Sequence, residues 1–165
     1  MPDTKNATPS SQLEGMPAPD FTLPTDSQEQ FTLSEQIGQL VVVYFYPKDD
    51  TPGCTKEAIA FTEHAAEFKK HDAVIIGISP DTPSKHDKFK AKHDLTVTLG
   101  SDTEKAVCNA YGVWVEKNMY GKKYMGVERA TFLIDKTGKI AKIWRKVRVP
   151  GHVEKVLEEL KGLSQ

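Results

Sequence analysis

The chain is poor in cysteine, with two thiols in 165 residues, at positions 54 and 108. Two cysteines this far apart do not form the dense disulfide framework of a small secreted domain. No stretch approaches the roughly 18 consecutive apolar residues of a membrane-spanning helix. The first residues also lack the basic start and apolar core of a secretory signal. We therefore expect a reducing, cytoplasmic location and no membrane partner.

Neither sign of charge is in excess, because 22 basic and 23 acidic residues give a net charge of −1. This balance argues against nucleic acid as a main partner. Glycine-rich phosphate-binding loops are missing, so no nucleotide cofactor is indicated. Two pairs of histidines are spaced seven residues apart, but two helical turns separate such side chains by about 10 Å. That spacing disfavours a shared metal ion, and we expect neither metal nor cofactor. The pairs are His64 with His71 and His86 with His93.

One basic stretch stands out locally within residues 140–149. Its charged members are Lys142, Arg145, Lys146 and Arg148. Apolar residues alternate with them, which favours a solvated face of a strand. A docking surface for an acidic reductant is the alternative.

The length fits one domain with a single sizeable core. Residues 1–14 are polar and are predicted to be a flexible tail, which leaves 15–165 as the domain. Strands are expected at 21–23, 30–33, 40–46, 73–79, 97–99, 130–135 and 140–145, and helices at 54–70, 83–93, 102–110 and 151–163. Strands that alternate with helices, followed by a hairpin and a closing helix, predict an α/β fold with a central mixed sheet.

The most informative residue is Cys54, which follows the buried strand and a turn of cap-forming residues. Thr51 is expected to be the N-cap of the next helix, with Pro52 at the first helical position. An ordinary thiol has a pKa of about 8.5 and is mostly protonated at neutral pH, whereas the N-terminus of a helix favours the reactive thiolate. A helix end supplies up to about 2 kcal/mol, so a distant arginine is also expected. An inert, buried thiol is the alternative.

This segment resembles the Pro-x-x-x-Thr-x-x-Cys signature of peroxiredoxins, and it is similar to the bacterioferritin-comigratory-protein (PrxQ) branch. The match is formed by Pro47, Thr51 and Cys54. Three later blocks and the segment Ala18–Leu23 are also similar to that branch, in the same order. The later blocks are Tyr111–Trp114, Arg129–Asp135 and Gly151–Val153. The resemblance implies a thioredoxin-like fold with a peroxiredoxin-type N-terminal hairpin and insertions.

The resemblance also implies a role for each matching residue. Cys54 would attack a peroxide oxygen and become a sulfenic acid, Thr51 would direct its hydroxyl at the peroxide, and Pro47 would shield the pocket from water. Arg129 would lie beside the thiolate, although its spacing alone favours a surface salt bridge. Tyr46, Gly53 and Trp114 would line the substrate pocket. For Trp114 and its neighbours up to Met125, the alternative is a protruding hairpin whose aromatic residues pack on the sheet.

The chain departs from many members of that branch in one respect. The position five residues after Cys54, where they carry a resolving cysteine, is Ile59, and the stretch Phe89–Lys92 has no cysteine either. The remaining thiol, Cys108, has the apolar surroundings of a structural residue, although a Cys54–Cys108 disulfide is an alternative. We therefore expect a one-cysteine mechanism.

The function expected is that of a monomeric thiol peroxidase acting on hydrogen peroxide and organic hydroperoxides. The resemblance implies that thioredoxin, glutaredoxin or glutathione recycles it. Two other classes stay open. A disulfide oxidoreductase normally needs Cys-x-x-Cys, and Glu57 occupies the second cysteine position here. A redox sensor or holdase would react with peroxide no faster than a free thiol does.

Overall fold

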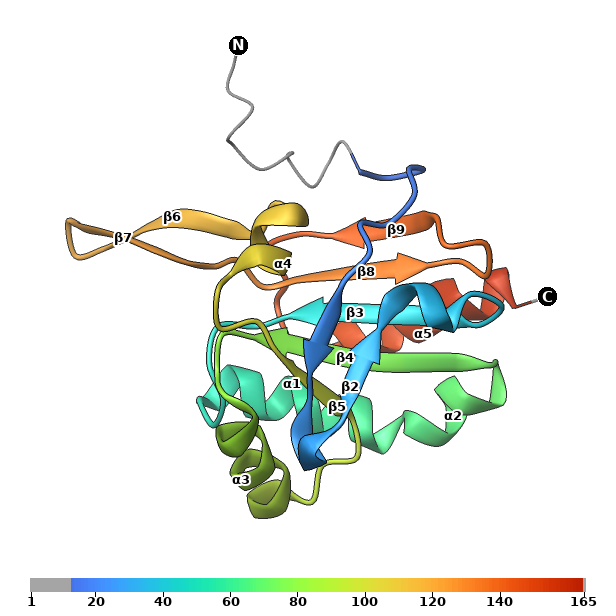
Figure 1. Ribbon diagram of the computed structural model, residues 1–165, viewed down its shortest axis with the longest axis horizontal. Coiled ribbons are helices and arrows are strands. Elements are labelled where there is room, and N and C mark those ends of the chain that lie inside the picture. Colours follow the sequence, from blue (N-terminus) through green and yellow to red (C-terminus); the bar gives the residue numbers. More distant parts are fainter. Residues whose placement is uncertain (1–12, 165) are drawn as a thin grey trace, which may run out of the picture.

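The structure is a computed structural model, which describes residues 13–164. Its centre is β3 (Leu40–Phe45), a continuous apolar strand whose six side chains are all buried. This strand pairs in parallel with β4 (Ala73–Ser79) and antiparallel with β8 (Ala130–Ile134). With β5 (Thr98–Ser101) and β9 (Ile140–Trp144) at the edges, the order across the sheet is β5-β4-β3-β8-β9 (Figure 1). This arrangement confirms the predicted mixed α/β sheet.

Alternate side chains of β3 enter two separate cores, because successive residues of a strand point to opposite faces. The helix-side core contains Tyr44 and lies under α1, α2, α3 and α5. The hairpin-side core contains Phe45 and lies under the N-terminal hairpin and α4. The bounds of the helices are α1 Pro52–Glu63, α2 Ala65–Lys70, α3 Pro83–His93, α4 Ala106–Ala110 and α5 His152–Leu163.

Two hairpins are added to this sheet. The N-terminal hairpin pairs β1 (Thr22–Pro24) with β2 (Gln30–Thr32), and short 3-10 helices cover Asp26–Gln28 and Leu33–Gln36. The second hairpin pairs β6 with β7 and projects from the body of the molecule, with Tyr120 fully exposed at its tip (Figure 1). Its strands are β6 Trp114–Met119 and β7 Lys122–Val127.

The helix predicted over 54–70 is two helices, which makes that prediction wrong in its middle. The break is at His64, where the backbone has φ −102° and ψ 7°. The His64 ring approaches the Ala60 carbonyl at 2.9 Å, so this side chain shares the acceptor of its own backbone N–H. Such local side-chain contacts with the backbone compete with helix continuation.

Two further boundaries differ from the prediction. The helix predicted over 102–110 begins at Ala106, because Lys105 has a left-handed φ of 62° and the Asp102 carboxylate accepts the Cys108 N–H at 2.7 Å. The strand predicted over 97–99 is displaced to Thr98–Ser101, because β4 continues to Ser79 and pairs with Ser101 there.

The predicted tail falls mostly on residues 1–12, which lie outside the described part of the chain. Its last two residues, however, are packed on the sheet. Leu13 is buried in the hairpin-side core, and the Glu14 carboxylate accepts the Ile143 N–H at 2.9 Å. The segment that follows pairs with the start of β9, where the Gly15 N–H bonds to the Ile140 carbonyl. In residues 13–164, no helix is long and apolar enough to cross a membrane.

Candidate active site

Cys54 lies in the first turn of α1, near the end of β3. The chain leaves β3 at Phe45, turns through 47–51 and enters α1 at Pro52, so Cys54 is the third helical residue. Its side chain is only 2% exposed and belongs to the helix-side core. The Cys54 sulfur therefore lies beside the free N–H groups at the positive end of the helix dipole.

Thr51 stands at the N-cap with an extended backbone, as predicted, but its side chain does not cap the helix. Its hydroxyl donates instead to the Lys48 carbonyl at 3.0 Å. The prediction of a side-chain cap was therefore wrong, because the tight turn offers this nearer acceptor. The Thr51 oxygen keeps its lone pairs, which can accept a hydrogen bond from a ligand O–H.

The sheet brings Arg129 to Cys54 from far along the chain. Ala130, the first residue of β8, pairs with Phe45, the last residue of β3. Arg129 precedes Ala130 and therefore lies where the chain turns toward α1. Its Nη2 donates to Cys54 Sγ at 3.4 Å. The guanidinium predicted beside the sulfur is present in the structure.

A third residue, Glu57, completes this cluster and was not among the predicted site residues. It lies one helical turn after Cys54, and its Oε1 accepts from Arg129 Nη1 at 2.7 Å. The Glu57 side chain is fully buried, and its Oε2 has no hydrogen-bond partner. An acidic residue at the third position after the nucleophile, on the buried face of a helix, was the available signal for it.

Arg129 is shared between two side chains, because it donates to both the Glu57 carboxylate and the Cys54 sulfur. Burial raises the pKa of Glu57 to about 7, against the opposing effect of Arg129. Burial acts to lower the pKa of Arg129, but the neighbouring Glu57 and Cys54 outweigh it and raise that pKa. Burial lowers the pKa of a further cation, Lys117 of β6, and the positive charge of nearby Arg129 lowers the Lys117 pKa further.

We expect Glu57→Gln to change the pH dependence of folding stability. A carboxyl whose pKa is raised in the folded state destabilises that state once it ionises, so the wild-type chain loses stability between about pH 4.5 and 7. The variant should lack this loss and should gain on the wild type by about 1–3 kcal/mol over that range. Urea unfolding across the pH range measures it. Both chains should carry Cys54→Ser, which removes the thiolate, and parallel pH curves would contradict the expectation.

Gly53 allows Arg129 to approach the helix end closely. A Cβ built at Gly53 would lie 3.1 Å from Arg129 Nη2, so a side chain there would displace the guanidinium. Pro47 is half-buried in the turn that precedes α1. Gly53 adjoins the cluster, whereas Tyr46 and Trp114 are directed elsewhere.

Tyr46 supports the active-site turn from within the core. Its hydroxyl donates to Asp49 Oδ1 at 2.6 Å, and Asp49 Oδ2 lies 2.7 Å from Nδ1 of the fully buried His86. Nε2 of His86 lies 3.0 Å from the Gly100 carbonyl, which can only accept. This network joins the turn to α3 and β5, so Tyr46 positions the turn and does not face a ligand with its hydroxyl.

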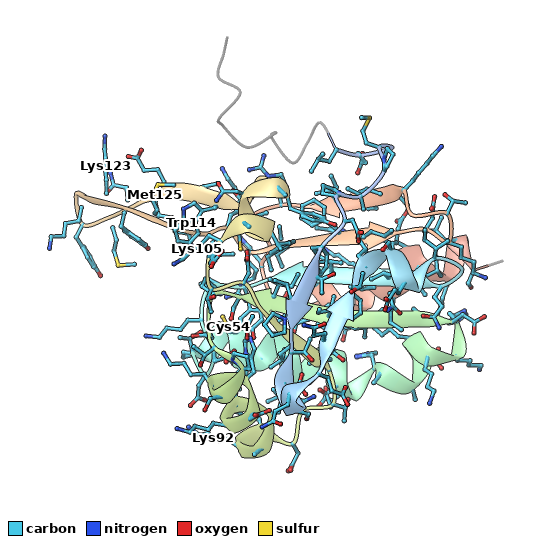
Figure 2. The ribbon with its side chains drawn as sticks, in the orientation of Figure 1. Cys54, Lys92, Lys105, Trp114, Lys123 and Met125 are labelled. Atoms are coloured by element: carbon cyan, nitrogen blue, oxygen red, sulfur yellow. The ribbon has the colours of Figure 1, made fainter. Side chains whose placement is uncertain are left out.

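Trp114 packs against the hairpin-side core, the face of the sheet opposite Cys54. It lies at the base of the β6–β7 hairpin, with the Lys105 ammonium 5.7 Å from its ring centre (Figure 2). The aromatic residue predicted at the pocket rim is therefore directed at the sheet, as the alternative interpretation of this segment had it.

Cys108 is also in the hairpin-side core and is completely buried. Burial, followed by the nearby Asp102, raises its pKa strongly. The two thiols are unpaired in the structure and belong to cores on opposite faces of the sheet. This placement offers no support for the Cys54–Cys108 disulfide.

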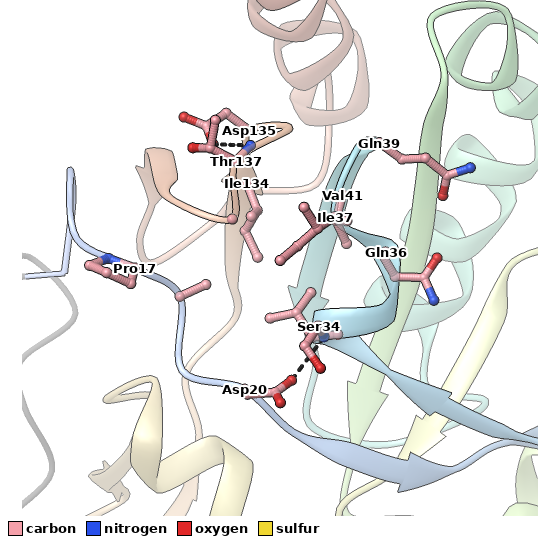
Figure 3. Close-up of a pocket in the computed structure, with 13 residues that line it drawn as sticks. Pro17, Asp20, Ser34, Gln36, Ile37, Gln39, Val41, Ile134, Asp135 and Thr137 are labelled. Carbon is pink, nitrogen blue, oxygen red and sulfur yellow. Dashed lines mark hydrogen bonds between the residues drawn. The ribbon is translucent and has the colours of Figure 1, made fainter.

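The cavity in Figure 3 is remote from this cluster. It measures about 190 Å³ and lies where β3 begins and β8 ends, between residues such as Val41, Ile134 and Pro17. Cys54 and Arg129 lie at the other end of the same two strands. Within residues 13–164, no group of three or more histidine, cysteine or acidic side chains is arranged to hold a metal ion.

Comparisons with known proteins agree with this geometry. The model of the AhpC/TSA family matches residues 15–143. A putative peroxiredoxin bcp of Coxiella burnetii is 51% identical over 146 residues, which cover 88% of this chain and 97% of that protein. The peroxiredoxin Bcp of Bacillus subtilis is 50% identical over 151 residues, covering 92% and 96%.

A solved structure shows the same fold. It is the Xanthomonas campestris bacterioferritin comigratory protein, reported for its alkyl peroxide reduction activity, with a TM-score of 0.84 and 43% identity over 88% of this chain and 92% of that one. The thioredoxin-like peroxiredoxin fold is thereby confirmed. With a buried cysteine at a helix N-terminus, an arginine on its sulfur and these relatives, the chain belongs to the AhpC/TSA family, in its Bcp (PrxQ) branch of peroxiredoxins.

Proposed function

We propose that this chain is a thiol peroxidase that reduces hydrogen peroxide and organic hydroperoxides by a one-cysteine mechanism, with Cys54 as the nucleophile. The observation that carries the proposal is the 3.4 Å contact between Arg129 Nη2 and Cys54 Sγ, at the N-terminus of α1. A fixed cation beside a sulfur stabilises the thiolate and the charge that develops during its attack.

In the first step, the Cys54 thiolate attacks one peroxide oxygen and forms an S–O bond. The O–O bond breaks, and the leaving oxygen takes a proton and departs as water or an alcohol. The sulfur is oxidised to a sulfenic acid while the peroxide is reduced. Arg129 stabilises the charge that moves onto the leaving oxygen, because its guanidinium has several donors in a fixed fork.

Thr51, Pro47 and Glu57 position the reactants in this scheme. The Thr51 hydroxyl proton is engaged by the Lys48 carbonyl, so its oxygen is left to accept the peroxide O–H. Pro47 limits access of water at the turn. Glu57 fixes the second arm of Arg129 and so aims the first arm at the sulfur.

An external thiol completes the cycle. It attacks the sulfenic sulfur and releases water, and a second thiol then breaks the mixed disulfide and restores Cys54. The burial of Cys108 on the other face of the sheet supports an external source. Thioredoxin, glutaredoxin and glutathione are the candidate reductants, and we propose a monomer working in the cytoplasm, where unpaired thiols are kept reduced.

Peroxide added without a reductant tests the one-cysteine mechanism. One equivalent should give a chain carrying one extra oxygen on Cys54, and a large excess should convert it to the sulfinic acid with two, because no neighbouring thiol intercepts the intermediate. Intact mass under non-reducing conditions, with peptide mapping, reads the products. Loss of two hydrogens, which marks a Cys54–Cys108 bridge, would contradict the mechanism. Cys108→Ser is the control and should give the same masses.

A further inference from the structure

A basic groove of about 520 Å³ lies beside α5, where β9 ends and the loop to the helix begins. Its lining contains five cationic side chains and no acidic one. The cations are spread over 14 positions of sequence. They come from β9, from the loop that follows it and from the first turn of α5. They are Lys142, Arg145, Lys146, Arg148 and Lys155.

Most of this charge has no partner within the molecule. Arg145 is neutralised, because its Nε and Nη2 donate to the two carboxylate oxygens of Glu128 at 3.0 Å each. The other four cations form no ion pair within 4.0 Å in the part of the chain that the structure describes. Burial lowers the pKa of His152, which also lines the groove, to about 4, so this ring adds no charge near pH 7. In a chain of net charge −1, four cations without an ion pair in one groove are a marked segregation of charge, although the Lys142 ammonium also lies 5.9 Å from the centre of the Trp144 ring.

Protection of an exposed sheet edge explains only part of this pattern. Charged residues, lysine above all, keep edge strands from pairing with other chains, and Lys142 on β9 can serve that purpose. Lys146 and Arg148, however, follow the end of β9 at Trp144, and Lys155 is on α5. Beyond the end of β9 there is no strand edge that another chain could pair with. Edge protection therefore does not explain Lys146, Arg148 and Lys155.

The groove adjoins the active site through the backbone of Arg129, the residue before β8. The Arg129 carbonyl accepts the Val147 N–H of the groove loop at 3.0 Å, while the side chain of the same residue donates to Cys54. Two residues further along, Thr131 pairs with Trp144, which also lines the groove. A partner that covers the groove therefore lies next to the nucleophile.

We propose that the basic groove is a docking surface for the acidic face of a dithiol protein of the thioredoxin class, the reductant of this enzyme. The proposal rests on the proposed function, since it names the partner that recycles Cys54. A protein interface covers about 800 Å² on each side, which is enough to span the groove and the adjoining sulfur. Tryptophan and arginine are the residue types that most often anchor interfaces, and Trp144 with Arg148 supplies both.

Reversal of the groove charges tests the proposal. The variant Lys146→Glu/Arg148→Glu/Lys155→Glu should lower kcat/KM for a thioredoxin of acidic composition by about 10-fold or more at low ionic strength, because complementary charge mainly raises the rate of association. The defect should shrink as salt is added, since exposed charges are screened. Turnover is followed with NADPH and thioredoxin reductase.

The matched control is Lys69→Glu/Lys70→Glu/Lys136→Glu, which makes the same change in net charge at the other end of the sheet, on exposed residues. It should keep the wild-type kcat/KM. Both variants should also oxidise Cys54 with one equivalent of peroxide and turn over with dithiothreitol as the wild type does. Equal loss in both triple variants, no loss in either, or no reduction by thioredoxin at all would overturn the docking proposal. Failure of Cys54 to oxidise in the wild type would overturn the proposed function itself.

Discussion

Replacing Cys54 with serine should abolish peroxide turnover, whereas replacing Cys108 with serine should leave most of it. A neutral hydroxyl at position 54 has neither the charge nor the nucleophilicity of a thiolate, and the second thiol is sealed in the other core. Consumption of hydrogen peroxide with a saturating reductant measures both variants. A drop of at least 10³-fold in the first variant is expected, which is the scale on which loss of a nucleophile is felt.

The two variants distinguish a one-cysteine mechanism from one that uses a Cys54–Cys108 disulfide. Cys108→Ser replaces a buried thiol with a hydroxyl of similar size, so urea unfolding should accompany the assay to detect any loss of folded protein. Equal loss of turnover in the two variants, with Cys108→Ser still folded, would contradict the one-cysteine mechanism and make Cys108 the resolving thiol.

Arg129→Met should lower kcat/KM for peroxide by about 10²–10³-fold, the usual effect of removing one fixed donor to developing charge. It should also lower stability by about 3 kcal/mol near pH 8, because the buried Glu57 then loses the cation that offsets the cost of its burial. Peroxide kinetics and urea unfolding give the two quantities separately.

The double variant Arg129→Met/Glu57→Gln distinguishes the two effects. It removes the uncompensated carboxylate, so most of the lost stability should return while activity stays low. Recovery of peroxide kinetics together with stability would show that Arg129 acts only through folding, and would contradict its role at the sulfur.

The sequence was informative wherever local chemistry decides the structure. The apolar run at β3 allowed one interpretation, because six consecutive buried side chains suit a central strand. The prolines at the starts of α1 and α3 marked those helices correctly. Boundaries set by single contacts were missed, such as the break at His64 and the start of α4 after Lys105. Helix propensities do not account for a side chain such as that of His64, whose ring shares the Ala60 carbonyl with the His64 backbone N–H.

The candidate site was predictable in its cysteine and arginine, through the resemblance of their surrounding blocks to a family. Glu57 was missed because a carboxylate on a helix usually faces water, and only the tertiary fold places it under Arg129. Trp114 was assigned to the pocket because the resemblance to the family implied a pocket rim there. The strand register, which one sequence does not give, directs it to the other face of the sheet instead.

The pairing of Phe45 with Ala130 has a consequence for how the enzyme is made in the cell. Cys54 leaves the ribosome 75 positions ahead of Arg129, which at about 5–20 residues per second is a lead of roughly 4 to 15 s. During that lead the nascent chain carries an ordinary thiol, and its guanidinium has not yet been synthesised. We therefore expect Cys54 to become highly reactive toward oxidants only after translation has supplied β8.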